Sequence, residues 1–410
     1  MKKFIFLALA SGFNRAGIFL LSPIIAFLVT VDEYGIFSLY LSFSTLLIIL
    51  ISANFSSIIA REIYENLITV VFYIKIINTF LIFILLVSIT LLVFTKTLTF
   101  SFIIFIASEA IFLINTTYIR YRKGDDVFFY NTLTKFFILA LAFYVFFNFY
   151  SLYSTDKTRD IFILMSLSNI VAFKESYRFI MFSNFNLAFI KIKSSFKYII
   201  FAFMLLPHIF SQWVMSGSDR YFVKMMYTPN DLGVYSFAYS LASIFMLVNA
   251  ALSLALPQIA VKNIKYYKSN KFIFNLFIST SFFYILILSM IFFSLPYFSN
   301  YKTYPVFKYS FVVLSGLYFL CYYTYYSSYL FYNRDAKYIS LISIGCAIIT
   351  IPSLFLFSYL WGVFGIAFVS FLIYFIYALV ITLRAAKKHC ILLFIPLSIV
   401  SIMYFIFSYN

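Results

Sequence analysis

Long apolar stretches separated by short polar breaks run through the whole chain. A helix needs about 20 mostly apolar residues to cross the hydrocarbon core of a bilayer. Windows of about that length predict spans at 4–30, 36–60, 69–94, 98–119, 127–149, 160–181, 198–218, 232–256, 272–295, 306–332, 338–360, 362–383 and 390–408. The pattern predicts an all-α, polytopic integral membrane protein with 12 transmembrane helices, or 13 if residues 390–408 cross rather than lie along the membrane.

Composition agrees with the pattern. Hydrophobic residues make up 64% of the 410 residues and charged residues 10%, against about 45–50% and about 25% in soluble domains. The N-terminal Met1-Lys2-Lys3 resembles the start of a signal peptide, but the apolar run continues to Val29, which predicts an uncleaved first span. Cys321, Cys346 and Cys390 have no paired spacing, so we interpret them as small hydrophobic residues.

The formal net charge of +17 raises the question of an acidic partner. Lys and Arg collect in alternate loops, as the positive-inside rule requires, and this places the N-terminus in the cytoplasm. The basic clusters then serve as topology signals that contact anionic membrane lipids, and nucleic acid is not an expected partner. No loop is long enough for a soluble domain.

An internal repeat divides the chain. Residues 32–42 recur as residues 230–240, with an acid, a glycine (Gly35 and Gly233), an aromatic residue and two serines at equal spacing. Six predicted spans separate the copies, so both halves have the same orientation and form two parallel bundles. The predicted organisation is a six-helix bundle at 1–182, a basic linker at 183–197, a second six-helix bundle at 198–384, and a C-terminal segment at 385–410.

Arg15 and Glu109 are ionisable residues within early predicted spans. Such groups are costly in lipid and usually face a polar interior. Arg15 shares a helix face with Ser11 and Ser22, which favours a clamp for a phosphate over a partner in an internal ion pair. Glu109 either binds a driving Na⁺ or H⁺ or pairs with Arg15 or Lys135, and the sequence does not decide between these.

The span at 198–218 is the most polar at membrane depth. As a helix it places His208, Gln212 and Asp219 on one face, and Pro207 with the Ser-Gly-Ser run predicts a kink or break. The alternative is that the chain leaves the membrane at Ser216, which would make Asp219 and Arg220 an ion pair at the interface. We find no metal-ligand spacing and no catalytic motif, so the sequence predicts a protein that is not an enzyme.

Several short motifs, taken in order, resemble polysaccharide flippases of the Wzx type in the multidrug/oligosaccharidyl-lipid/polysaccharide exporter (MOP) superfamily. The matching residues are Arg15 with Ser22-Pro23, the segment 32–38, Arg61, Asp219-Arg220, the segment 230–235, Leu256-Pro257, Pro352 and the segment 361–367. The resemblance implies a two-bundle transporter with a cationic cavity that moves undecaprenyl-pyrophosphate-linked oligosaccharide, an O-antigen or capsule unit, across the bacterial cytoplasmic membrane.

The same resemblance implies roles for individual residues. Arg15, Arg61 and Arg220 are similar to basic residues that meet the pyrophosphate, and Pro23 and Pro257 join the two repeat glycines as structural positions. A polysaccharide polymerase and a chain-length regulator are the protein partners that it implies. No cofactor is expected beyond a coupling Na⁺ or H⁺.

Two rival functions remain open. A multidrug exporter of the same superfamily would share the fold but would be expected to carry more acid within its spans to bind cationic drugs. A membrane polysaccharide polymerase usually has one large external loop, and the longest candidate here, near residues 150–160, is short. Both rivals therefore rank below the flippase.

Overall fold

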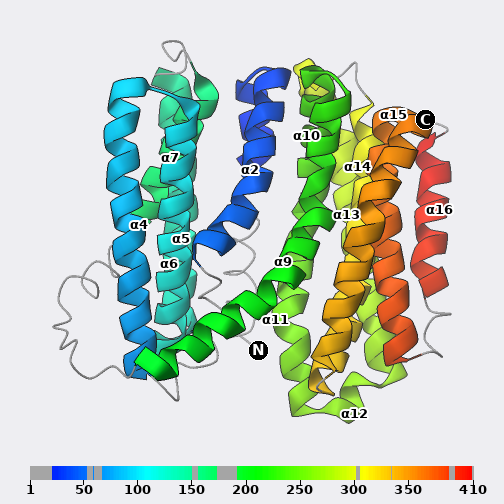
Figure 1. Cartoon of the computed structure of the whole chain (residues 1–410). Coiled ribbons are helices and arrows are strands. Elements are labelled where there is room, and N and C mark those ends of the chain that lie inside the picture. The colour runs from blue at the N-terminus through cyan, green and yellow to red at the C-terminus, as the bar shows by residue number, and fades with distance from the viewer. Residues whose placement is uncertain are drawn as a thin grey trace. The chain divides into compact units, whose positions relative to one another are not determined.

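The computed structural model describes residues 21–52, 59, 67–149, 156–172, 192–301, 305–333, 335–386 and 393–408. All regular secondary structure in these ranges is helical, which confirms the predicted all-α class. Eight described helices are long and apolar enough to cross a membrane. Described helical segments overlap every predicted span (Figure 1).

The chain folds into two compact units, residues 1–14 with 40–210 and residues 15–39 with 211–410. Two helices, α2 (Val31–Ile51) and α9 (Ile192–Met226), contribute one part to each unit. The units therefore differ in composition from the predicted bundles at 1–182 and 198–384, whose boundaries stay predictions. Most of the predicted linker, 183–191, lies outside the described residues.

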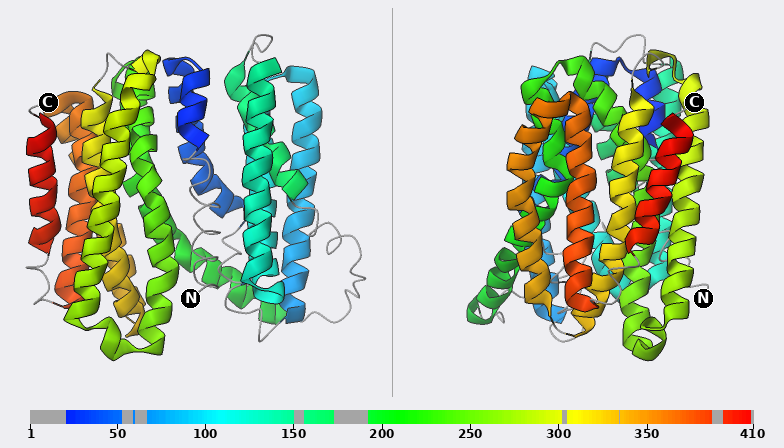
Figure 2. Two further views of the ribbon diagram at one scale, coloured as in Figure 1. Left: turned by 180° about the vertical axis from the view of Figure 1, so that it is seen from behind. Right: turned by 90° about the vertical axis from the view of Figure 1, so that its right-hand side faces the viewer.

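The first unit is built around α5 (Leu98–Lys123), which contacts α4 (Leu67–Thr95), α6 (Asp125–Phe149) and α7 (Lys157–Ala172). These helices run side by side in Figures 1 and 2. Most of α5 is buried, because it is surrounded by the other three helices. The turn from α5 to α6 is made by Gly124, whose φ of 113° is a conformation that glycine adopts readily.

In the second unit α14 (Val306–Tyr332) is central and contacts α10 (Pro229–Ala242), α11 (Met246–Lys262), α13 (Asn270–Ser294) and α15 (Ala336–Ala385). Short helical segments join these elements: η2 (Ser243–Phe245), α12 (Ile264–Tyr267), η3 (Leu295–Tyr297) and η4 (Ser299–Tyr301). The last helix, α16 (Phe394–Ser408), lies against α13 and α14. It corresponds to the predicted thirteenth segment.

The long helix α15 is a hairpin of two helices. Gly362 has a φ of 64°, outside helical geometry, and reverses the chain there. Ser343 in the first arm and Tyr377 in the second share a hydrogen bond of 2.6 Å between their hydroxyl oxygens, although 34 residues separate them. A Cβ on Gly365 would lie 1.9 Å from the Phe357 carbonyl oxygen, so the arms pack very closely. The arms match the separately predicted spans 338–360 and 362–383.

Of the kink or break predicted in the span at 198–218, the break is wrong. α9 runs as one helix from Ile192 to Met226, through Pro207 and through Ser216–Ser218. The hydroxyls of Ser216 and Ser218 donate to the carbonyls of Gln212 and Val214 one turn earlier, so both serines satisfy their donors within the helix. The alternative interpretation had the chain leave the membrane at Ser216. The structure shows that the helix itself continues past this residue.

Candidate functional site

The two repeat segments meet at their glycines inside the second unit. A Cβ on Gly35 would lie 2.8 Å from the backbone nitrogen of Gly233. A Cβ on Gly233 would lie 2.0 Å from the carbonyl oxygen of Val31. Glycine is needed at both positions because the backbones of α2 and α10 approach too closely for any side chain. The repeat therefore marks a helix crossing, and its glycines are close-approach positions.

The acids of the repeat cap these two helices. The Glu33 carboxylate accepts from the backbone N–H of Thr30, and the Thr30 hydroxyl accepts from the N–H of Glu33, at 2.9 and 3.3 Å. Thr228 and Asp231 form the same reciprocal capping box at the start of α10. The repeat thus extends back to a threonine at position 30 and at 228, a signal that we missed in the sequence.

A buried chain of hydroxyls ties α2 to α10 beside the crossing. The phenol of Tyr34 donates to Ser240 Oγ at 2.7 Å, and Ser22 Oγ lies 2.6 Å from the same phenol oxygen. Because Tyr34 has one proton to give, Ser22 is the donor in the second bond. All three side chains are buried. This network adds directional contacts to the glycine crossing.

Asp219 and Arg220 form a buried charged cluster between α9 and α10. The Asp219 carboxylate accepts from the Tyr235 hydroxyl at 2.6 Å and from the backbone N–H of Arg220 at 2.8 Å. The guanidinium carbon of Arg220 lies 4.1 Å from the ring centroid of Tyr239, and one guanidinium nitrogen lies 4.0 Å from the Asp219 carboxylate. Among the described residues, Arg220 Nε has no hydrogen-bond partner. The cluster therefore holds a desolvated cation that retains a free donor.

The other polar residues predicted on α9 lie elsewhere. Gln212 donates to the Tyr377 hydroxyl at 2.8 Å, and the Tyr377 ring stacks on Tyr323 with 4.0 Å between centroids. Gln212 therefore fastens α9 to α14 and α15. His208 lies in the first unit and is half-buried, and its Nδ1 lacks a hydrogen-bond partner in the described part of the chain.

In the first unit, Glu109 pairs with Lys135. The ammonium lies 2.7 Å from both carboxylate oxygens and 4.5 Å from the ring centroid of Phe112. The Lys135 and Glu109 side chains are 10% and 15% exposed. Of the alternatives left open by the sequence, the structure therefore contains the pairing with Lys135. Asn78 on α4 and Asn115 on α5 also exchange two amide hydrogen bonds.

Replacing Lys135 with methionine is expected to lower the free energy of unfolding by about 2 kcal/mol, because it leaves a nearly buried carboxylate without its cation. Denaturant titration of the purified protein in detergent measures this change. The double variant Glu109→Gln/Lys135→Met should recover most of the loss. A double variant as unstable as the single one would show that the loss does not come from an unpaired carboxylate.

Two of the basic residues predicted to bind the pyrophosphate, Arg15 and Arg61, lie outside the described residues. Pro23 is half-buried in the helical turn before α2, and Pro257 lies inside α11. The structure thus brings Asp219 and Arg220 together with the helix that carries Gly233. Their partners Tyr235 and Tyr239, four residues apart on α10, belong to the repeat, but no pattern in the sequence pairs them with charges.

The fold is similar to that of several solved transporter structures. No family model matches the chain, and no curated protein sequence is significantly similar. An inward-facing multidrug resistance MATE family transporter of the MOP superfamily matches at 12% identity over 94% of both chains, with a TM-score of 0.61. The lipid II flippase MurJ, in an inward closed conformation, matches at 15% identity over 95% of this chain and 98% of its own, with a TM-score of 0.51. A MOP superfamily transporter from Pyrococcus furiosus matches at 10% identity over 94% and 95%, also with a TM-score of 0.51.

The chain is therefore a multi-pass membrane protein, given its apolar helices and this fold. More particularly, its fold is similar to that of a MATE transporter of the MOP superfamily and to that of the lipid II flippase MurJ. At these identities the likeness defines the fold, and cargo has to be argued from the charges of this chain.

Proposed function

We propose that this protein is a flippase that moves undecaprenyl-pyrophosphate-linked oligosaccharide across the bacterial cytoplasmic membrane. The lipid II flippase among its structural neighbours supports the cargo class, because that neighbour carries a lipid-linked substrate by its name. The Pyrococcus neighbour is described as having a binding pocket of reverse polarity that suggests a different function. We therefore use the sign of the internal charge to argue the cargo of this chain.

The observation that carries the proposal is that the acids inside α5 and α9 lie beside basic residues. Glu109 lies beside Lys135, and Asp219 lies beside Arg220 and the Tyr235 hydroxyl. The other described acids lie at or next to helix starts. A carrier of cationic drugs needs acid that no base neutralises, whereas Arg220 Nε is a buried donor without a partner in the described chain. This charge balance favours an anionic cargo.

In the proposed mechanism two bundles rock to expose a central cavity to one side of the membrane at a time. Arg15 holds the pyrophosphate, with Arg61 and Arg220 as further contacts, because a guanidinium matches phosphate oxygens with two parallel hydrogen bonds. The glycan crosses through the wet cavity while the lipid tail stays in the bilayer. We further propose the cytoplasmic membrane as the location, with the N-terminus in the cytoplasm. Reporter fusions after Lys388 and Asn410 test the topology.

Coupling to Na⁺ or H⁺ through Glu109 or Asp219 is a separate proposal. Both carboxylates have a basic neighbour, so a bound ion would have to compete with Lys135 or Arg220. Transport rates measured with and without a Na⁺ gradient and across a range of pH test this. A rate insensitive to both gradients would rule out coupling while leaving the flippase proposal intact.

Expression of the chain in a bacterium that lacks its own polysaccharide flippase is expected to restore surface polysaccharide. Arg15→Ala should reduce that polysaccharide at least about tenfold, since a hydrogen bond to a charged group contributes about 1.5–3 kcal/mol and each 1.4 kcal/mol is tenfold. The exposed Lys337 at the start of α15 provides the control variant Lys337→Ala, which should restore polysaccharide fully. Full restoration by Arg15→Ala would refute the clamp, and failure of the unaltered, membrane-inserted chain would refute the flippase.

A drug exporter is the second candidate, because the MATE transporter matches with a TM-score of 0.61 against 0.51 for MurJ. Resistance to cationic drugs in a strain that lacks its own exporters separates the two. We expect no gain in resistance.

A further inference from the structure

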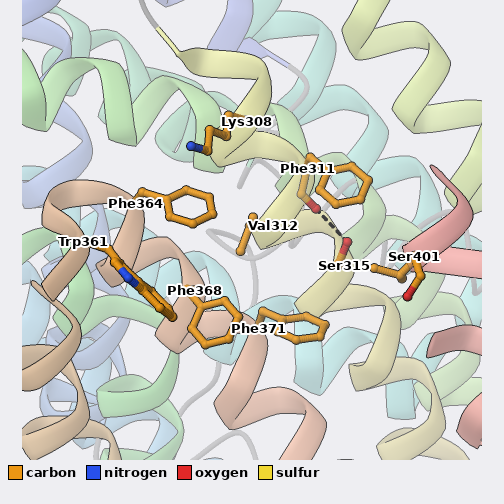
Figure 3. A pocket seen from close by; sticks show the side chains of 10 residues that line it. Lys308, Phe311, Val312, Ser315, Trp361, Phe364, Phe368, Phe371 and Ser401 are labelled. Atoms are coloured by element: carbon orange, nitrogen blue, oxygen red, sulfur yellow. Dashed lines mark hydrogen bonds between the residues drawn. The ribbon is translucent and has the colours of Figure 1, made fainter. Parts of the chain in front are cut away.

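The second unit contains a cavity of about 690 Å³ between α14, α15 and α16. Its volume falls within the range of about 300–1,000 Å³ typical of ligand sites. The walls are Phe311, Val312 and Ser315 from α14, an aromatic row from the end of the first arm and the second arm of α15, and Val400 and Ser401 from α16 (Figure 3). It is separate from the Asp219–Arg220 cluster, whose residues do not line it.

Phe364, Phe368 and Phe371 follow each other at intervals of four and three residues on one face of the second arm of α15, the spacing of one helical stripe. Trp361 completes the row from the end of the first arm, just before the reversal at Gly362. The rings of Trp361 and Phe368 meet edge to face with 5.2 Å between centroids, and Phe368 contacts Phe371 at 5.8 Å. On the opposite wall the Ser315 hydroxyl is engaged with the Phe311 carbonyl at 2.7 Å. The interior is therefore apolar.

A single lysine lies at one end of this cavity. Lys308 is the third residue of α14, close to the end of a spanning helix, and it is exposed. Its ammonium lies 4.3 Å from the ring centroid of Phe364, which directs it across the opening (Figure 3). No ion pair joins Lys308 to an acid among the described residues. A cation at the end of a membrane-spanning helix, above an apolar cavity, is complementary to an anionic amphiphile.

We propose that this cavity binds an anionic phospholipid of the surrounding bilayer, with the phosphate at Lys308 and an acyl chain along the aromatic row. The proposal is independent of the cargo. Large apolar side chains on α15, among them Ile348, Leu356 and Trp361, are 50% or more exposed, as expected of a helix surface that faces acyl chains. α16 closes the cavity through Val400 and Ser401, which gives the thirteenth helix a role as one wall of a lipid site.

Native mass spectrometry of the full purified chain tests the site. The protein is equilibrated in micelles that hold equal amounts of phosphatidylglycerol and phosphatidylcholine, and the retained lipids are counted. We expect about fivefold preference for phosphatidylglycerol, the factor associated with one lysine near a membrane surface. Lys308→Gln should abolish the preference, and Lys308→Arg should keep it. Lys337→Gln, which removes an exposed lysine at the start of α15, should also keep it.

The apolar part of the site is tested separately. Ser401→Trp fills the cavity and should lower the number of retained lipids with Lys308 intact. A phosphatidylglycerol with a photoreactive acyl chain should label α16 or the second arm of α15 in the unaltered chain. This labelling experiment does not depend on the folding of any variant. Preference that survives Lys308→Gln, or labelling confined to other helices, would overturn the proposal. Displacement of the phospholipid by an equal amount of polyprenyl phosphate would overturn it in favour of the cargo's own lipid tail.

Discussion

Replacing Asp219 with alanine is expected to lower the free energy of unfolding by about 3–5 kcal/mol, the cost of breaking a buried ion pair by removing one partner. Asp219 and Arg220 are 3% and 4% exposed, so the guanidinium would be left without its carboxylate in a nearly anhydrous environment. The Tyr235 hydroxyl would also lose its acceptor, which lies 2.6 Å away. Denaturant titration of the purified variant in detergent measures the loss.

Two further variants provide comparisons for Asp219→Ala: one removes the charge but keeps the shape, and one breaks an exposed ion pair. Asp219→Asn keeps an acceptor for Tyr235 but removes the negative charge, so its cost should lie between those of Asp219→Ala and the unaltered chain. The pair of Arg384 and Asp335 joins the second arm of α15 to its start at 3.2 Å, and its side chains are 53% and 32% exposed. Arg384→Ala should therefore cost about 0.2–1 kcal/mol. An Asp219→Ala variant as stable as Arg384→Ala would contradict the description of a buried cluster.

Replacing Gly233 with alanine is expected to destabilise the protein by about 1–3 kcal/mol through overpacking. The position of a Cβ is fixed by the backbone, so no rotamer avoids the Val31 carbonyl oxygen at 2.0 Å, and α2 must move away from α10. The displacement would also disturb the bond between Tyr34 and Ser240. The same titration measures the stability, and proteolysis of the folded variant reports whether the crossing has loosened.

Gly345 provides the matched control for this prediction. It lies in the first arm of α15, where a Cβ would have no heavy atom within 4 Å. Gly345→Ala should therefore raise the free energy of unfolding by about 0.5–1 kcal/mol, because alanine has less conformational entropy to lose in a helix. The two substitutions are chemically identical and are expected to have opposite signs. A stabilised Gly233→Ala would show that the two helices do not cross as closely as described.

The helices were predictable from the sequence because each apolar run is long enough to cross a membrane. The two arms of the α15 hairpin also match two separately predicted spans, 338–360 and 362–383. The repeat identified Gly35 and Gly233 as equivalent positions, but equal spacing does not say that two glycines touch. Their contact depends on how α2 packs on α10, which is a property of the tertiary structure.

The chemistry of the site was harder to predict than its location. Asp219 and Arg220 stand out in the sequence, but their environment is supplied by Tyr235 and Tyr239 from another helix. The acids of the repeat cap helices, since Glu33 and Asp231 bond the starts of their own helices, and the sequence analysis assigned them no role. Pro207 suggested a break because proline lacks an N–H, but the helix continues through it.

The central part of the proposed flippase function is that the protein recognises its cargo by the anionic pyrophosphate. The direct measurement uses the purified chain in liposomes that contain a fluorescent polyprenyl-pyrophosphate-linked sugar, the matching neutral polyprenyl-linked sugar, or a cationic drug. Movement of the sugar lipid between leaflets is followed by loss of fluorescence on adding an impermeant quencher. We expect protein-dependent movement of the pyrophosphate lipid and little movement of the other two. Equal rates for the neutral lipid, or transport of the drug alone, would contradict it.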